Sequence, residues 1–198
     1  MATWKKQITE EATDEVLFDF FRNRGEERAF EILVGRHSAS LMRFIRGMLG
    51  QNSAYADDVY QETWIKVINN SNKWKGGSFK AWLTRIARNT VIDVFRRQNK
   101  MLSLDSEDEL GISFVEKMPD LRQIPGEAIM GEEAVALIVE EVMKLPPGQK
   151  EVFLMRVEQE LSFREIAELL EIPLNTALGR MHYAVNKLRE VIADKIKI

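Results

Sequence analysis

The chain has 198 residues, of which 45% are hydrophobic and 30% are charged, a balance typical of globular domains that excludes wholesale disorder. Its 28 basic and 31 acidic residues give a net charge of −3, which by itself argues against a nucleic-acid-binding protein, since such proteins usually carry a basic excess. The absence of cysteine excludes disulfides, thiolate metal sites and cysteine nucleophiles.

The first hundred residues show helical periodicity throughout, whereas strand signals are nearly absent. Apolar residues spaced three and four apart predict a long helix over residues 26–49. A shorter helix is expected before it, with an apolar face formed by Val16, Leu17, Phe20 and Phe21.

A third helix is predicted to begin at Ser53, a suitable N-cap residue, and to extend to about residue 72, with Ile68 among its apolar positions. A Gly-Gly pair then interrupts the helical pattern. Ser78 is expected to cap a fourth helix over residues 79–97. Four helices of this size suffice for a compact α domain.

Residues 99–131 differ in character, because prolines, glycines and scattered acids indicate a flexible acidic linker. Helical signals resume at residue 132. A Ser-x-x-Glu capping box at residues 162–165 opens a short helix, and a tight turn at 171–173 leads into a long one. This order is the outline of a DNA-binding helix-turn-helix, although an ordinary α-hairpin in a bundle has the same outline.

The net charge is unevenly distributed along the chain. Residues 76–100 hold six basic residues and one acid, a net charge of +5, whereas residues 101–133 hold two basic residues and nine acids, a net charge of −7. A basic stripe on a helix suits phosphate contacts, and a solvated helix surface is the alternative. The small overall charge is therefore a sum over segments suited to different partners.

No stretch approaches the roughly 20 apolar residues of a membrane span, and the N-terminus lacks the apolar core of a signal peptide. We therefore expect a cytoplasmic protein without direct membrane insertion. No group of side chains resembles a catalytic site, and the two histidines, His37 and His182, are far apart in the sequence. The sequence predicts a protein that is not an enzyme and has no catalytic residues, metal site or cofactor.

Four stretches together carry a resemblance to a known family. They are AFEILVGRHSASLMRFIRGML, ADDVYQETWIKVI, FKAWLTRIARNTVIDVFRRQ and LPPGQKEVFLMRVEQELSFREIAELLEIPLNTALGRMHYAVNKLRE. In order and spacing they are similar to regions two and four of bacterial RNA polymerase sigma factors of the extracytoplasmic-function (ECF) group. The resemblance implies an all-α fold, with a region two helical bundle over 1–98 and a region four helix-turn-helix domain over 132–198, joined by the linker at 99–131. It also implies a function, which is to bind core RNA polymerase and to direct promoter recognition and transcription initiation.

The resemblance assigns polymerase docking to the third predicted helix. The residues that match the segment docking on the clamp helices of the β′ subunit are Asp57, Asp58, Gln61, Glu62 and Trp64. Asp58 and Glu62 lie one helical turn apart with Gln61 beside them, so one polar face is able to meet a basic partner helix. Asp57 and Asp58 also favour the helix N-terminus through its dipole, which is compatible with docking. The implied partner is the core enzyme, through its β and β′ subunits.

The resemblance assigns reading and opening of the −10 promoter element to the fourth helix and the loop before it. The residues that match, with the basic residues of the same helix, are Trp74, Lys75, Ser78, Lys80, Arg85, Arg88, Asn89, Asp93, Arg96 and Arg97. Opening a duplex requires compensation for lost stacking, which aromatic and polar side chains around a flipped base supply. Trp74, Phe79 and Trp82 are the available aromatics, and Trp82 fits the core better. Asp93 either orients one of the arginines or contacts a base.

The resemblance assigns reading of the −35 element to the recognition helix after the tight turn. Its buried face is expected to hold Ala177, Met181, Ala184 and Leu188. The residues expected to reach DNA are Asn175, Thr176, Leu178, Gly179, Arg180, His182, Tyr183 and Lys187. Positions that are often basic in the family carry Leu178, Tyr183, Val185 and Asn186 here. Fewer phosphate contacts predict weaker, less salt-dependent binding to the −35 element.

The resemblance further implies an anti-sigma factor, often membrane-anchored, that holds the free protein inactive. Two alternative functions remain at this point. A sigma-mimic adaptor would sequester an anti-sigma factor without binding promoters; the altered recognition helix favours it slightly, whereas Arg96, Arg97 and Arg180 oppose it. A stand-alone helix-turn-helix repressor would bind operator DNA without polymerase, and the docking segment at 57–64 opposes it.

Overall fold

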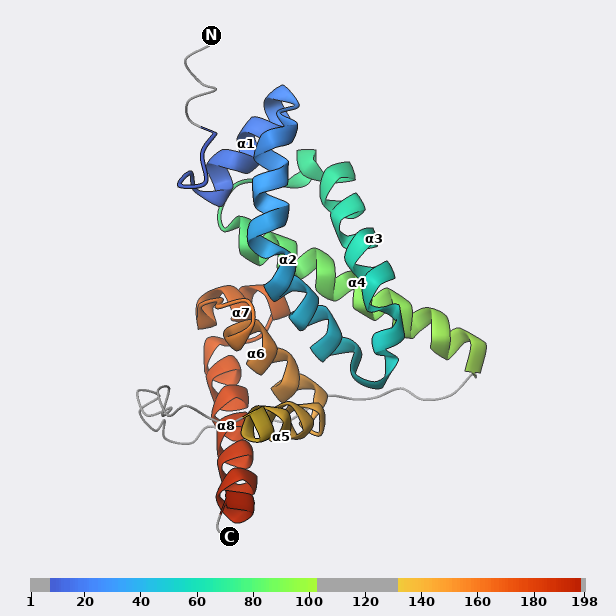
Figure 1. Cartoon of the computed structure of the whole chain (residues 1–198), viewed down its shortest axis with the longest axis vertical. Helices are drawn as coiled ribbons and strands as arrows, with labels where there is room; N and C mark the ends of the chain where they lie inside the picture. Colours follow the sequence, from blue (N-terminus) through green and yellow to red (C-terminus); the bar gives the residue numbers. More distant parts are fainter. Residues whose placement is uncertain (1–7, 103–131, 197–198) are drawn as a thin grey trace. The chain divides into compact units, whose positions relative to one another are not determined.

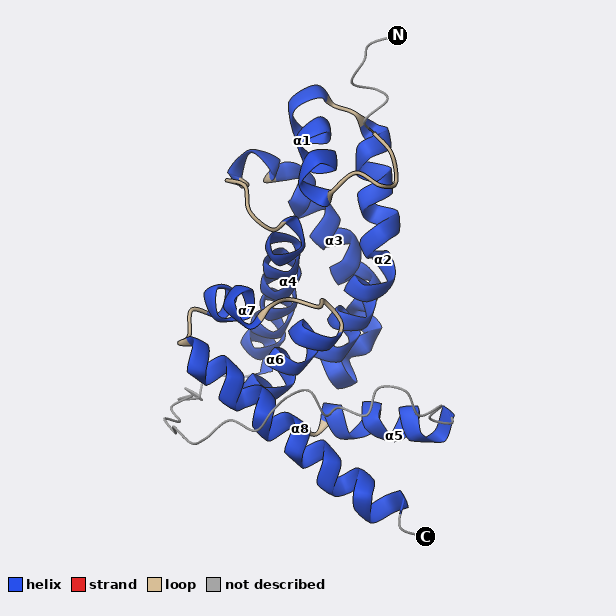
Figure 2. Cartoon of the chain, turned by 90° about the vertical axis from the view of Figure 1, so that its left-hand side faces the viewer, coloured by secondary structure: helices blue, strands red, loops and turns tan. Residues whose placement is uncertain are grey.

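The computed structural model describes residues 8–102 and 132–196, and every regular element in these two ranges is a helix (Figures 1 and 2). The prediction of an all-α protein is therefore confirmed. The chain divides into two compact units, Met1–Asp105 and Ser106–Ile198. Within the described ranges, no helix combines the length and the apolar character that a membrane span requires.

The first unit is a bundle built around one long helix (Figure 1). Its elements are α1 (Asp14–Arg24), α2 (Glu27–Leu49), the 3-10 turn η2 (Gly50–Tyr55), α3 (Ala56–Asn69), the 3-10 turn η3 (Ser71–Lys73) and α4 (Phe79–Leu102). Helix α2 contacts α1, α3 and α4. Its apolar residues recur every three or four positions, and the fully buried ones are Ala29, Leu33, Leu41, Phe44 and Ile45.

Helices α3 and α4 have boundaries that differ from those predicted. Ser53 does not begin α3 but lies in η2, where the backbone of Asn52 (φ −85°, ψ 22°) breaks the helical path. Helix α4 continues to Leu102, so the first four residues of the expected linker are helical, and residues 103–131 lie outside the described residues.

Helix α1 buries a face that its composition does not reveal. Leu17 and Phe18 are fully buried, whereas Val16, expected in the core, is 42% exposed. The Phe18 ring lies at the centre of an aromatic cluster, with ring centroids 4.7 Å from Phe79 and 5.4 Å from Trp74. This cluster joins α1 to the start of α4 and to the loop before it.

A carboxylate at the start of α1 ties that helix to α2. Asp14 Oδ2 lies 2.7 Å from His37 Nε2, and its other oxygen accepts a hydrogen bond from Arg36. Burial alone raises the pKa of the Asp14 carboxyl, but the hydrogen bonds and charges of His37 and Arg36 outweigh burial, and the pKa is lowered from its usual value. The ionised form of Asp14 is therefore the one that stabilises the fold.

We expect the contact between Asp14 and His37 to make the stability of the first unit fall at acidic pH. Because the pKa of folded Asp14 lies below that of the unfolded chain, its contribution is fully present above the unfolded pKa and is lost as pH falls through the folded pKa. Asp14→Asn should cost about 1–2 kcal/mol of unfolding free energy at neutral pH. Denaturant unfolding of both proteins between neutral pH and about pH 3 should show this difference shrinking in acid. A difference that is constant with pH would contradict this role for the Asp14 charge.

The second unit contains the expected helix-turn-helix. Its elements are α5 (Glu132–Met143), α6 (Pro147–Val157), α7 (Phe163–Leu170) and α8 (Leu174–Ile196). Both halves of the capping box are formed, since Ser162 N donates to Glu165 Oε2 at 2.8 Å and Glu165 N donates to Ser162 Oγ at 3.2 Å. The predicted buried face of α8 is confirmed by the low exposure of Ala177, Met181, Ala184 and Leu188.

The turn between α7 and α8 contains a residue in an unfavourable backbone conformation. Glu171 caps α7 in the left-handed region (φ 56°, ψ 40°), which costs a residue with a β-carbon roughly 1–2 kcal/mol. Glu171→Gly should therefore raise the unfolding free energy of the second unit by about 0.5–1 kcal/mol, after the greater freedom of glycine in the unfolded chain is subtracted. Thermal unfolding measures the gain.

A matched control removes the same charge from the same unit. Glu190 is exposed and lies within the long helix α8. Glu190→Gly should lower stability by about 1 kcal/mol, because glycine is unfavourable inside a helix. Destabilisation by both variants would show that Glu171 makes contacts worth more than its backbone strain.

Candidate functional site

The predicted docking residues of α3 divide into an exposed group and a buried one. Asp57, Asp58 and Gln61 are exposed and lie within the first two turns of the helix. Trp64, which was expected to take part in docking, is 6% exposed, and its ring meets Phe30 edge-on at 5.5 Å between centroids. Trp64 thus packs beneath the helix with little of its ring at the surface, and its part in docking stays a prediction.

The exposed face of α3 also includes two apolar residues, of which Ile68 was among the apolar positions of the predicted helix and Ile65 was not. Ile65 is 55% exposed and Ile68 is 43% exposed, so neither lies in the core. Together with Asp58 and Gln61 they recur every three or four residues, which puts all four on one side of the helix. We call Asp57, Asp58, Gln61, Ile65 and Ile68 the α3 face; acids lie at its N-terminal end and isoleucines at its C-terminal end.

Glu62, the remaining docking residue, belongs to an ion-pair cluster between α3 and α4. Its Oε1 lies 2.9 Å from Lys66 Nζ and 3.4 Å from Arg97 Nη2. Lys66 Nζ also lies 3.1 Å from Asp93 Oδ2, and Asp93 Oδ1 lies 3.8 Å from Arg96 Nη1. Asp93 therefore orients Arg96 and Lys66 in this structure, which supports the first of its two expected roles.

The loop before α4 is held by the aromatic cluster. Trp74 is 5% exposed and Phe79 is fully buried, so neither ring lies open to solvent in this structure, and their expected contact with a flipped base stays a prediction. Arg22 of α1 stacks over the Trp74 ring at 4.9 Å and donates a hydrogen bond to its carbonyl oxygen at 2.9 Å. Trp82 is half-buried and packs 5.3 Å from the ring of Phe18, as expected of a core residue.

The tip of this loop is shaped by two glycines with positive φ. Gly76 and Gly77 have φ values of 92° and 84°, which residues with a β-carbon rarely adopt. Lys75 beside them is exposed. Ser78 caps α4, since its Oγ accepts a hydrogen bond from Ala81 N at 3.1 Å. Between the buried Trp74 and the capped start of α4, the loop thus exposes one basic side chain, Lys75, and the backbone of two glycines.

Helix α4 presents most of its predicted DNA residues to solvent. Arg85, Asn89, Arg96 and Arg97 are exposed, and Lys80, Arg88 and Asp93 are half-buried. Arg96 and Arg97 are 75% and 67% exposed at their side chains even though each lies near a carboxylate. Exposed ion pairs contribute about 0–1 kcal/mol, so both arginines are able to exchange a carboxylate for a phosphate at little cost.

The recognition helix α8 presents a surface with few charges. Asn175, Tyr183 and Lys187 are exposed, whereas Thr176, Leu178, Gly179, Arg180 and His182 are half-buried. Leu174 is 40% exposed and Tyr183 is 48% exposed, and His182 Nε2 lies 3.0 Å from Asn186 Nδ2. Of the three predicted residues that are exposed, Lys187 alone carries a charge, and the expectation of fewer phosphate contacts than in a strongly basic helix stays a prediction.

Arg180 lies against the N-terminal turn of α6. A β-carbon added to Gly148 would come within 3.1 Å of Arg180 Cζ and 3.2 Å of its Nε. The lack of a side chain at position 148 therefore makes the space in which this guanidinium lies. The sequence alone does not indicate this contact, because the two residues are 32 positions apart and belong to different helices.

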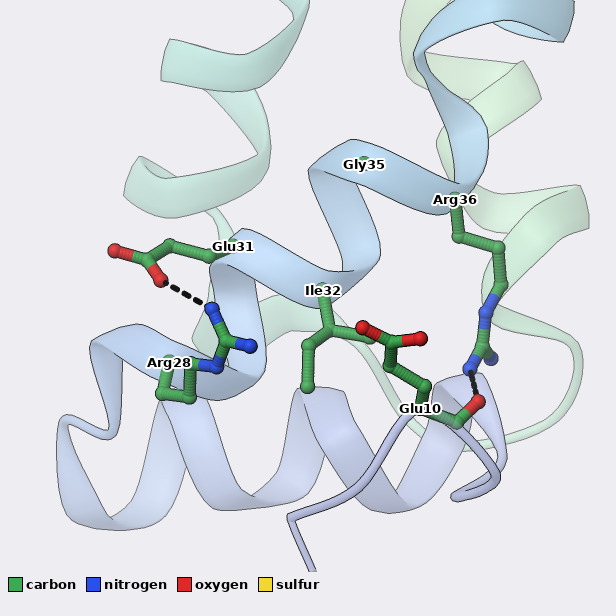
Figure 3. Close-up of a pocket in the computed structure, with 6 residues that line it drawn as sticks. All are labelled: Glu10, Arg28, Glu31, Ile32, Gly35 and Arg36. Atoms are coloured by element: carbon green, nitrogen blue, oxygen red, sulfur yellow. Dashed lines mark hydrogen bonds and ion pairs between the residues drawn. The ribbon is translucent and has the colours of Figure 1, made fainter.

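A surface pocket of about 420 Å³ lies on the first unit, lined by Glu10, Arg28, Glu31, Ile32, Gly35 and Arg36 (Figure 3). Its arginines are engaged, because Arg28 pairs with Glu31 at 3.2 Å and Arg36 donates to the carbonyl oxygens of Glu10 and Ala12 at 2.7 and 3.0 Å. None of the lining residues belongs to the predicted site. The hydrogen bonds of Arg36 hold the segment before α1 against α2.

The two units match known families. Residues 33–101 match Sigma-70 region 2, and residues 136–188 match Sigma-70 region 4. Over 178 residues the chain is 30% identical to the ECF RNA polymerase sigma factor SigW of Bacillus subtilis, covering 86% of this chain and 92% of that protein. The chain belongs to the ECF sigma factors. As such it binds core RNA polymerase and directs promoter recognition and transcription initiation.

Other relatives and solved structures agree with this assignment. The ECF RNA polymerase sigma-E factor of Haemophilus influenzae is 27% identical over 200 residues, covering 96% of this sigma factor and 98% of the relative. The structure of CnrH in complex with the cytosolic domain of CnrY has a TM-score of 0.65 at 23% identity, covering 91% of this chain and 97% of CnrH. RpoE in complex with the anti-sigma factor NepR, from Bartonella quintana, has a TM-score of 0.62 at 19% identity, covering 83% and 96%. At these identities the two structures establish a shared fold.

Proposed function

We propose that this sigma factor docks on core RNA polymerase through the α3 face. The observation that carries the proposal is the side-by-side exposure of acidic and apolar residues there, with Trp64 packed beneath. A basic partner helix on the clamp of the β′ subunit would meet the carboxylates of Asp57 and Asp58, and apolar side chains of the same partner would cover Ile65 and Ile68.

We propose that α4 and the loop before it contact the −10 element. Lys75, Gly76 and Gly77 are exposed in the loop before α4, where they would line the path of a single strand, and the exposed Arg96 and Arg97 of α4 would contact its backbone phosphates. Since Trp74 is buried, bases would have to meet the polar side chains of this loop and helix unless the aromatic cluster rearranges. The corresponding −35 contacts would come from the exposed end of α8, with Arg180 as its half-buried cation.

Two further proposals concern the setting in which the protein works. We propose that it acts in the cytoplasm by binding energy alone, without covalent chemistry of its own, because its family consists of transcription initiation factors. We also propose that an anti-sigma factor, in some cases membrane-anchored, holds the free protein inactive. Support comes from the similarly folded RpoE, which was solved in complex with an anti-sigma factor.

Reconstitution with core RNA polymerase tests these proposals. The purified chain should form a holoenzyme and enrich fragments with shared −10 and −35 sequences from a promoter library. Asp58→Ala with Gln61→Ala should weaken core binding, whereas Glu31→Ala, which removes an exposed carboxylate from α2, should leave it unchanged. Failure of the wild-type chain to bind core contradicts the docking proposal. Core binding without transcription from any template favours the sigma-mimic adaptor.

A further inference from the structure

Lys66 lies between the two proposed contact surfaces of the first unit. Its ammonium group donates to three oxygens, namely Glu62 Oε1 at 2.9 Å, Asp93 Oδ2 at 3.1 Å and Thr90 Oγ1 at 3.2 Å. Glu62 belongs to α3, whereas Thr90 and Asp93 belong to α4. All three hydrogens of the ammonium therefore have acceptors, and the lysine joins the two helices.

The same two carboxylates are the partners of the arginines proposed to bind promoter phosphates. Arg97 Nη2 lies 3.4 Å from Glu62 Oε1, and Arg96 Nη1 lies 3.8 Å from Asp93 Oδ1, both longer than the contacts that Lys66 makes. Burial alone lowers the pKa of Lys66, but the hydrogen bonds and charges of Glu62 and Asp93 outweigh burial and raise the pKa. The lysine is thus fully charged at neutral pH.

The cluster consists of three cations and two carboxylates, so its net charge is +1. When Arg96 and Arg97 move onto phosphates, Glu62 and Asp93 lose their arginine partners and lie near the negatively charged DNA backbone. Lys66 remains bound to both and compensates them. Without it, each departing arginine would leave an uncompensated carboxylate that repels phosphate.

We propose that Lys66 is a positioning residue for promoter binding, which holds Glu62 and Asp93 and offsets half of their combined negative charge so that Arg96 and Arg97 are released to the DNA backbone. The inference rests on the proposed role of the two arginines at the −10 element. It adds a residue that itself touches neither DNA nor polymerase.

Two substitutions separate charge from packing. Lys66→Met keeps the length of the side chain and removes its charge, whereas Lys66→Arg keeps the charge. With holoenzyme assembled first, Lys66→Met should bind a fragment selected by the wild type about tenfold more weakly, and Lys66→Arg within about threefold of wild type. The Lys66→Met loss should shrink as salt is raised, because it is electrostatic.

A third substitution identifies the group through which Lys66 acts. In an Asp93→Asn background, Lys66→Met should cost less than about threefold, because one of the carboxylates that it compensates is gone. A purely structural lysine predicts the opposite result, an equal loss in both backgrounds, insensitive to salt and accompanied by weaker core binding. That result, or equal promoter binding by Lys66→Met and the wild type, would overturn the proposal.

The promoter-fragment experiment distinguishes failure of the proposed role of Lys66 from failure of the proposed role of α4. A wild-type chain that selects no promoter fragment contradicts the proposed roles of α4 and of Lys66 together. A wild-type chain that selects fragments, with a Lys66→Met variant that binds them equally well, contradicts the role of Lys66 alone.

Discussion

Replacing Arg96 and Arg97 together with alanine is expected to weaken promoter-complex formation by about 10- to 100-fold at physiological salt, while core binding changes little. Both side chains are mostly exposed and their ion pairs are long, so they contribute little to folding. If each arginine holds one phosphate, the slope of log affinity against log salt should fall by about 1.5–2 in the double variant. Equilibrium binding of holoenzyme to a selected promoter over a salt series measures both quantities.

The control for this variant removes the same charge elsewhere. Arg24 and Arg28 are exposed near the turn between α1 and α2, and neither belongs to the proposed contact surfaces. Arg24→Ala with Arg28→Ala should leave promoter binding and its salt dependence within about twofold of wild type. An equal loss of core binding and promoter binding in the Arg96/Arg97 variant would show that these arginines serve the fold or the docking face.

Phe18→Ala should have the largest effect on stability. The side chain is fully buried and its ring contacts four others, in Phe21, Trp74, Phe79 and Trp82. Truncation leaves a cavity at the centre of this cluster, and buried Phe→Ala changes cost about 3–5 kcal/mol. Because the packing of Trp74 against Phe18 holds the loop that contains Gly76 and Gly77, we also expect slower promoter opening from any variant protein that remains folded.

Tryptophan fluorescence during denaturant unfolding measures the loss, since Trp64, Trp74 and Trp82 all belong to the described part of the first unit and report on its unfolding. Phe20→Ala is the matched control, because Phe20 is on the same helix but only half-buried, and it should cost less than half as much. Phe18→Leu keeps most of the buried volume and should cost about 1–2 kcal/mol, which leaves a folded protein for the promoter assay. Equal losses for Phe18→Ala and Phe20→Ala would contradict the central role of Phe18.

The elements with a clear local pattern were predictable from the sequence. Helix α2 alternates apolar and polar residues at helical spacing, and α7 of the second unit carries the Ser-x-x-Glu signature, so both formed as expected. The burial of α8 was predictable for the same reason. These predictions depend on residues three or four positions apart, and contacts at that spacing within one helix can be inferred directly from the sequence.

The parts that were missed depend on residues far apart in the sequence. The run from Val16 to Phe21 is apolar at five of six positions, so no periodicity distinguishes Phe18 as the buried residue. Trp74 is buried because Arg22 and Phe18, more than 50 positions earlier, cover it. The cluster around Lys66 joins residues 27 positions apart, which no helical spacing indicates.

The placement of Arg180 against Gly148 has a consequence for exchanging promoter preference between relatives. In a chimera that receives α8 alone from another sigma factor, the donor's residue at position 180 would lie against Gly148 in the first turn of α6, where Arg180 lies in this protein. Conversely, a donor residue larger than glycine at position 148 would force this guanidinium to shift by at least a few tenths of an ångström. We therefore expect a chimera to preserve the surroundings of Arg180 when α8 is exchanged together with the first turn of α6, two segments that are separate in the gene but form one contact.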